Sequence, residues 1–186
     1  MLAAGEARVL LSFTTIDEAA VIDGESAGHA DRSRAHLLAW TGLDEQVDLA
    51  RVADDLGFSS VWVAETWGHD AVGMLGYIAA ATTRITLGAA VVQMPARQPA
   101  AVGMAAATIN ELLRGRMRLG FGLSGPQVSE GWYEVPFTAP LGRTREYVDV
   151  VRAVLANQTV QYHGEHFRIP SDESRGLGLG KPRPST

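Results

Sequence analysis

From about position 36, short apolar segments alternate with longer segments in which apolar residues recur every three or four positions. The first kind is typical of buried strands and the second of amphipathic helices. The pattern predicts strands over 59–65, 84–92 and 117–123, and helices over 43–56, 71–82, 99–113 and 143–156. It also predicts an irregular segment over 124–141 and a small hairpin over 160–169 that turns at Gly164.

The first strand of this series has two candidates. Residues 36–40 form a short, mostly apolar run, whereas residues 9–11 are an alternative that leaves a long loop before the first helix. The polar residues between the two runs show weak periodicity. We therefore divide the chain into an extension of uncertain structure over 1–35, a domain of alternating strands and helices over 36–170, and a Gly- and Pro-rich tail over 171–186.

The order of the predicted elements indicates the fold class. Strands that alternate with helices predict βαβ units and a parallel sheet. The strands are apolar throughout, as expected where both faces of a sheet are buried. A doubly wound sheet and a (β/α)8 barrel of the TIM type both fit this order. Such a barrel typically takes about 250 residues. The chain has 186 residues and four predicted strands, so in the barrel interpretation it corresponds to about the first four βα units.

Three polar residues stand at or after the end of the strand over 59–65, the position where parallel barrels place their active sites. Glu65 is a candidate to accept a hydrogen bond from a bound ring or to transfer a proton, but it could equally cap a helix. His69 is a candidate general acid or base because imidazole titrates near neutral pH; the alternative is a solvated loop residue. Asp70 is the predicted N-cap of the next helix.

A glycine-rich segment, GFGLSG over 120–125, has the spacing G-x-G-x-x-G. A dinucleotide-binding motif needs a helix directly after these glycines and an acid at the end of a later strand. Here Pro126 follows, and the acid at the right distance, Glu146, lies in a predicted helix. We therefore interpret the segment as a strand-to-loop turn where a ligand approaches the backbone. Gln93 follows another strand and offers a donor and an acceptor to a heterocycle.

Composition excludes several kinds of chemistry. The chain has no cysteine, which excludes disulfides, thiolate catalysis and Cys-ligated zinc, and it shows no signal peptide or long apolar segment, so we expect a cytoplasmic protein without membrane contact. The net charge of −5, with Lys and Arg scattered, predicts no nucleic-acid partner. His163, Glu165 and His166 are close in sequence, but their spacing is not that of a metal-ligand set, so no metal is predicted.

The stretch from about Ala39 to Lys181 resembles the luciferase-like flavin or deazaflavin oxidoreductases. The resemblance rests on several runs that occur in order: WTGLDEQVDLARVADDLGFSSVWVAET, TTRITLGAAVVQMPARQPAAVGMAAATINELLRGRMRLGFGLSGPQVSEGW, PLGRTREYVDVVRAVL and YHGEHFRIP. It is strongest to the branch that uses coenzyme F-420 and is related to methylenetetrahydromethanopterin reductase. The family fold is the (β/α)8 barrel.

The resemblance implies hydride transfer with the deazaflavin coenzyme F-420, or, as an alternative, monooxygenation with reduced flavin mononucleotide (FMN). It implies that the coenzyme ring lies at the carboxyl ends of the strands, near Glu65, and that Ala90–Val91 is the bulged, often cis, peptide that backs the ring. We expect coenzyme contacts from Glu65, Ala90, Val91, Gln93, Gly122, Ser124 and Gly125, with Glu65 and His69 as catalytic candidates.

The resemblance also implies an incomplete barrel. Relatives continue after the run GLGLGKP into four more strands, whereas this sequence stops at Thr186. We therefore expect a truncated or split oxidoreductase that acts on a small-molecule substrate, either as a homo-oligomer or with a complementing chain. The alternative is a non-catalytic half-barrel, either a remnant or a module for association.

Overall fold

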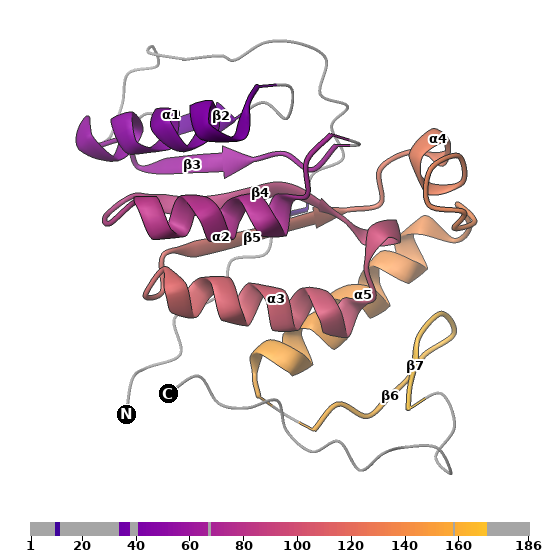
Figure 1. The fold of residues 1–186 in the computed structure, drawn as a ribbon. Helices are drawn as coiled ribbons and strands as arrows, with labels where there is room; N and C mark the ends of the chain where they lie inside the picture. Colours follow the sequence, from indigo (N-terminus) through magenta and orange to yellow (C-terminus); the bar gives the residue numbers. More distant parts are fainter. Residues whose placement is uncertain (1–9, 12–33, 38–40, 67, 158, 171–186) are drawn as a thin grey trace, which may run out of the picture. The chain divides into compact units, whose positions relative to one another are not determined.

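The computed structural model describes residues 10–11, 34–37, 41–66, 68–157 and 159–170 (Figure 1). The strands are β1 (Leu10–Leu11), β2 (Arg34–Leu37), β3 (Ser60–Val63), β4 (Thr86–Gln93), β5 (Met117–Gly122), β6 (Tyr162–His163) and β7 (Arg168–Ile169). The helices are α1 (Leu43–Asp55), α2 (Ala71–Ala81), α3 (Pro99–Leu112), α4 (Pro126–Ser129) and α5 (Pro140–Leu155), with a short 3-10 helix η1 (Met94–Ala96).

These residues fall into two compact units. The first lies within Met1–Val92 and Ile109–Gly122 and contains the large sheet with α1 and α2. The second lies within Gln93–Thr108 and Leu123–Thr186 and contains η1, most of α3, α4, α5 and the β6–β7 hairpin. None of the described helices is long and apolar enough to cross a membrane.

The large sheet has the strand order β1-β5-β4-β3-β2. Its pairs β2–β3, β3–β4 and β1–β5 are parallel. Leu87 N donates to Arg116 O over 3.0 Å, and Gly120 lies against the carbonyl of Ala89 further along, so β4 and β5 also run in the same direction. The predicted parallel βα architecture is therefore confirmed, and within the described residues the sheet stays open rather than closing into a barrel.

Both candidates for the first strand are strands. β2 pairs all four of its residues with β3, while β1 pairs with β5 at the other edge of the sheet. β2 begins at Arg34, two residues before the predicted start, and residues 38–40 of the predicted strand lie outside the described residues. β1 and β2 are therefore the two edge strands of the sheet.

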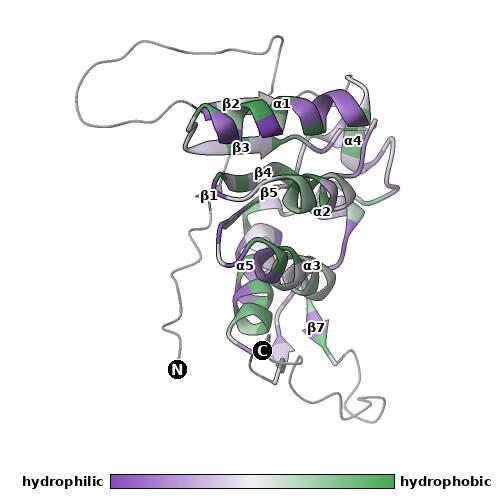
Figure 2. Cartoon of the chain, turned by 60° about the vertical axis from the view of Figure 1, so that its left-hand side comes forward, coloured by the Kyte–Doolittle hydropathy of each residue, from purple (hydrophilic) through white to green (hydrophobic). Residues whose placement is uncertain are grey.

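The buried face of α1 differs from the face that its leucines suggest. Leu43 and Leu56 are 44% and 71% exposed, whereas Gln46 and Asp54 are 1% and 5% exposed. Apolar and polar residues alternate around α1, whereas α2 is apolar along nearly its whole length (Figure 2). The two helices lie side by side, and Tyr77 OH donates to Asp44 Oδ1 over 3.1 Å. Polar side chains in the buried face of a helix need partners, and both Gln46 and Asp54 have them.

The second unit packs α3 against α5. Pro99 begins α3, as predicted, and a Cβ at Gly103 would lie 2.7 Å from Val154 Cγ1, so close helix contact requires glycine there. The apolar residues that recur at helical spacing in the predicted helix over 143–156 form the buried face of α5; they are Tyr147, Val150, Val151 and Val154. α5 begins three residues earlier than predicted, at Pro140, and the segment predicted as irregular contains the four-residue helix α4, which is too short to show a periodic pattern.

Asp54 anchors the segment that leads into β4. Its carboxylate accepts hydrogen bonds from Thr83 N (2.7 Å), Ile85 N (2.8 Å) and Arg84 N (3.1 Å). Burial raises the pKa of Asp54, but the hydrogen bonds from these three backbone groups outweigh burial, so the pKa lies below its usual 3.8. The ionised carboxylate is therefore the form that stabilises the fold.

We expect Asp54→Asn to lower the free energy of unfolding by about 2 kcal/mol, the scale of hydrogen bonds to a charged group. The stabilisation is fully present above the unfolded pKa of about 3.9 and is lost as pH falls through the lower folded pKa. Urea unfolding at pH 7 and at decreasing pH measures both effects. Asp55→Asn is the matched control because Asp55 is 84% exposed. An equal loss of stability in both variants would contradict the assignment.

Candidate functional site

Glu65 lies just beyond β3 and is buried, with 7% of its surface exposed. Its backbone N–H donates to Val91 O in β4 over 3.3 Å, and its Oε1 accepts from Ala71 N, also over 3.3 Å. Ala71 is the first residue of α2, whose N-terminal N–H groups have no partner within the helix. The helix-capping interpretation of Glu65 is therefore confirmed, and its role towards a coenzyme stays a prediction.

Asp70 is the N-cap of α2, as predicted. Its Oδ2 accepts from Gly73 N over 2.5 Å, and its backbone carbonyl accepts from Met74 N over 3.1 Å. Two carboxylates, Glu65 and Asp70, therefore lie at the N-terminus of α2, where the helix dipole favours negative charge.

His69 is half-buried in the loop before α2 and contacts a residue that the sequence pattern did not single out. Its Nδ1 lies 3.3 Å from Gln46 Nε2, and the same amide nitrogen donates to Thr41 O over 3.1 Å. Gln46 was missed because the helix prediction used apolar positions alone. Its place directly before the inward Val47 is the signal that could have identified it.

The end of β4 has the backbone feature that the family resemblance implied. The peptide bond between Ala90 and Val91 is cis, which confirms that expectation. Ala90 and Val91 are half-buried, whereas the flanking Ala89 and Val92 are buried. Three predicted site residues therefore lie together in the first unit: Ala90, Val91 and Glu65, whose backbone N–H donates to Val91 O.

The remaining predicted coenzyme contacts follow the ends of β4 and β5. Gln93 is the last residue of β4 and is 5% exposed. Gly122 ends β5 and is buried, Ser124 is exposed with a φ of 60°, and Gly125 is the N-cap of α4. Gly122 belongs to the first unit, whereas Gln93, Ser124 and Gly125 belong to the second.

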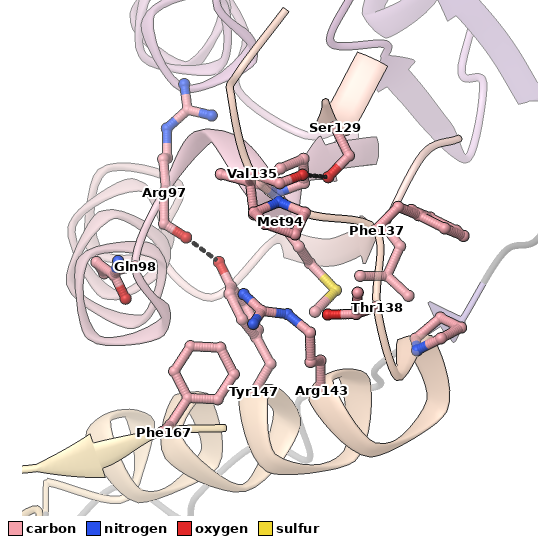
Figure 3. A pocket seen from close by; sticks show the side chains of 14 residues that line it. Met94, Arg97, Gln98, Ser129, Val135, Phe137, Thr138, Arg143, Tyr147 and Phe167 are labelled. Carbon is pink, nitrogen blue, oxygen red and sulfur yellow. Dashed lines mark hydrogen bonds between the residues drawn. The ribbon is translucent and has the colours of Figure 1, made fainter. Parts of the chain in front are cut away.

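The second unit contains a pocket that the sequence did not predict (Figure 3). Its volume is about 50 Å³, which is enough for a few waters or one small polar group and too small for a three-ring system. It is lined by Met94, Pro95, Arg97, Gln98, Leu123, Ser129, Val135, Pro136, Phe137, Thr138, Pro140, Arg143, Tyr147 and Phe167.

Aromatic and cationic side chains from α5 and the hairpin form one side of this pocket. Tyr147 OH donates to Arg97 O over 3.0 Å, and its ring meets Phe167 edge-on with centroids 5.8 Å apart. Arg143 lies over Phe167, with Cζ 5.5 Å from the ring centroid, and reaches towards Tyr147, while the guanidinium of Arg97 points away from them (Figure 3). The donors of Arg143 and the absence of Asp and Glu from the lining favour a polar or anionic group.

Glu146 holds the β6–β7 hairpin against α5. Its carboxylate accepts from the backbone N–H groups of Glu165, His166 and Phe167, each over 2.9 Å. The hairpin turns at Gly164, as predicted, where Gly164 N donates to Phe167 O over 2.9 Å. Glu165 and His166 therefore serve as backbone donors, and no group of three or more His, Cys, Asp or Glu suited to a metal occurs in the described part of the chain.

A parallel βα sheet with its candidate residues at the carboxyl ends of the strands is typical of TIM-barrel enzymes. The chain belongs to the luciferase-like monooxygenase family, whose model matches residues 22–184.

One curated relative supports this assignment, and one solved structure shares the fold. A putative coenzyme F-420-dependent oxidoreductase of Mycobacterium tuberculosis is 47% identical over 135 residues, which are 72% of this chain and 39% of the relative. The F-420-dependent tetrahydromethanopterin reductase of Methanopyrus kandleri superposes with a TM-score of 0.67 at 24% identity, over 75% of this chain and 44% of that structure.

An FMN complex also shares the fold. The oxygenating constituent of 3,6-diketocamphane monooxygenase from Pseudomonas putida superposes with a TM-score of 0.62 at 19% identity, over 68% of this chain and 37% of that structure. The chain spans about two fifths of the length of the curated relative from Mycobacterium tuberculosis.

We expect Glu146→Gln to release the hairpin. Both carboxylate oxygens accept from backbone N–H groups. In the amide an NH2 group replaces one of these oxygens, and this group donates and cannot accept. Amide hydrogen exchange at Glu165, His166 and Phe167 should accelerate at least severalfold. Burial raises the pKa of Glu146, but the hydrogen bonds from His166, Phe167 and Glu165 lower it below its usual 4.5. Protection in the native protein should therefore be full above pH 4.5 and be lost as pH falls through the lower folded pKa.

The matched control is Glu165→Gln, which changes an exposed side chain in the same hairpin and leaves the backbone donor intact. Slow exchange that persists in Glu146→Gln would show that other contacts hold the hairpin.

Proposed function

We propose that this chain forms the ring-binding part of an F-420-dependent oxidoreductase that transfers hydride to or from a small-molecule substrate. The observation that carries the proposal is the link between Glu65 and Val91, which fixes a buried carboxylate beside the end of β4. The identity to the putative F-420-dependent oxidoreductase supports the choice of coenzyme.

The residues at the end of β4 fit a flat ring. Ala90 and Val91 carry small side chains and are half-buried, so a ring would meet backbone and methyl groups rather than bulky side chains. On the neighbouring strand, a Cβ at Gly120 would lie 2.5 Å from Ala89 O, so β5 approaches β4 closely there. Apolar and backbone groups with a few polar groups beside them are typical of the lining of cofactor sites.

The coenzyme would supply hydride transfer chemistry, and the chain would supply binding, orientation and proton transfer. Glu65 would accept a hydrogen bond from a ring N–H through its carboxylate, while its Oε1 stays bonded to Ala71 N. His69 would exchange a proton with the substrate from its imidazole. The backbone at Gly122, Ser124 and Gly125, together with Gln93, would contact the coenzyme beyond the strand ends.

We propose that the chain acts as a homo-oligomer or together with a complementing chain. The competing candidate is an FMN-dependent monooxygenase, which the shared fold of the FMN complex favours. A non-catalytic association module is the third candidate, and it predicts that neither coenzyme binds.

We expect the purified chain to bind F-420 more tightly than FMN, as followed by fluorescence titration with size-exclusion chromatography alongside. Preference for F-420 by a dimer or by a complex with a complementing chain would support the proposal. Tighter binding of FMN would favour the monooxygenase, and no binding of either coenzyme would favour the association module.

Glu65→Gln tests the role of the carboxylate. The amide oxygen can still accept from Ala71 N, so the thermal unfolding midpoint should change little, while F-420 binding should weaken about tenfold, equivalent to about 1.4 kcal/mol. Glu45→Gln is the control because Glu45 is exposed on α1. An unchanged affinity of Glu65→Gln for F-420 would show that Glu65 acts only as a helix cap.

A further inference from the structure

Gln46 is a buried polar residue that contacts both a backbone carbonyl and an imidazole ring. It is 1% exposed, in the face of α1 that also buries Val47 and Ala50. Its amide nitrogen lies 3.1 Å from Thr41 O and 3.3 Å from His69 Nδ1.

The carbonyl of Thr41 fixes the orientation of the Gln46 amide. A backbone carbonyl oxygen accepts hydrogen bonds and cannot donate, so the amide atom that faces it must be the nitrogen. A side-chain NH2 group has two hydrogens. One is directed to Thr41 O, and the other is directed to His69 Nδ1.

The contact with Gln46 also assigns the proton of His69. Nδ1 must accept from the Gln46 amide, and in a neutral imidazole the nitrogen that accepts is not protonated. A proton on Nδ1 would face the amide N–H group, donor against donor. The neutral ring therefore carries its proton on Nε2, which has no hydrogen-bond partner among the described residues.

We propose that Gln46 is a positioning residue that holds neutral His69 in the Nε2–H tautomer and directs that proton to a bound substrate. The tautomer assignment stands on the contacts of Gln46 alone, whereas the direction of the proton to substrate rests on the proposed function. His69 then donates through Nε2, and its Nδ1 takes no part in proton transfer while Gln46 occupies it.

The imidazole 15N chemical shifts of the full chain test the tautomer without any coenzyme. At a pH where the histidines are neutral, His69 should show a protonated Nε2 and an unprotonated Nδ1. Its signals are assigned by their loss in His69→Asn. A predominantly protonated Nδ1 in the native protein would overturn the proposal.

Two variants separate positioning from structural support. Gln46→Met keeps the length of the side chain and removes both donors, so the His69 ring should shift towards a mixture of tautomers. Val47→Ala removes packing from the neighbouring buried position and leaves the donors, so it should lower stability and keep the Nε2–H tautomer. The same tautomer in Gln46→Met as in the native protein would contradict the proposal.

Activity tests the second half of the proposal and distinguishes it from the proposed function. If F-420 binds, Gln46→Met should lower kcat at least tenfold while the dissociation constant of F-420 stays within twofold. An unchanged kcat would confine Gln46 to setting the tautomer and would overturn its role in proton transfer. If F-420 fails to bind at all, the proposed function falls, and the 15N measurement still decides the tautomer.

Discussion

The hydrogen bond from Glu65 N to Val91 O is the contact on which the candidate site depends. The β3–β4 ladder ends at Val63, opposite Ala89, and this bond continues the link between the two chain segments beyond the ladder. The side chain of the same residue accepts from the first N–H of α2. Glu65 therefore connects the end of β3 with the end of β4 and with the start of α2. His69 lies in the loop between Glu65 and Ala71, and both ends of this loop are hydrogen-bonded.

The same device recurs in both units. Asp54 accepts from three consecutive backbone N–H groups before β4, and Glu146 accepts from three in the hairpin. A carboxylate has about four acceptor sites and no donor when ionised, so it suits a row of backbone N–H groups that no strand or helix satisfies. In a chain without cysteine, these carboxylates provide local attachment between segments distant in sequence.

The sequence predicted the elements with strong periodicity and missed those that depend on tertiary partners. The apolar runs identified β3, β4 and β5, and Tyr147, Val150, Val151 and Val154 identified the inward face of α5. The burial of Gln46 and Asp54 was not predicted, because His69 lies 23 residues from Gln46 in sequence and Ile85 lies 31 residues from Asp54. Hydropathy cannot reveal that a polar side chain is buried against such distant partners. The pocket beside Tyr147 escaped prediction for the same reason, since it joins residues from η1, α5 and the hairpin.

The position of Glu65 explains why a structural role and a chemical role need not exclude each other. A carboxylate at a helix N-terminus lies in a field that favours its negative charge, and that stabilisation operates with or without a bound ring. The capping role of Glu65 is therefore compatible with each candidate function, and its link to Val91 is the feature that fits a ring. Gln46 and His69 are more informative. The buried amide of Gln46 directs one hydrogen to a backbone carbonyl and the other to a half-buried imidazole. It adds little packing that an apolar residue could not supply, so its proposed effect is the fixed Nε2 proton. That proton would serve a substrate that accepts it, as the proposed function requires.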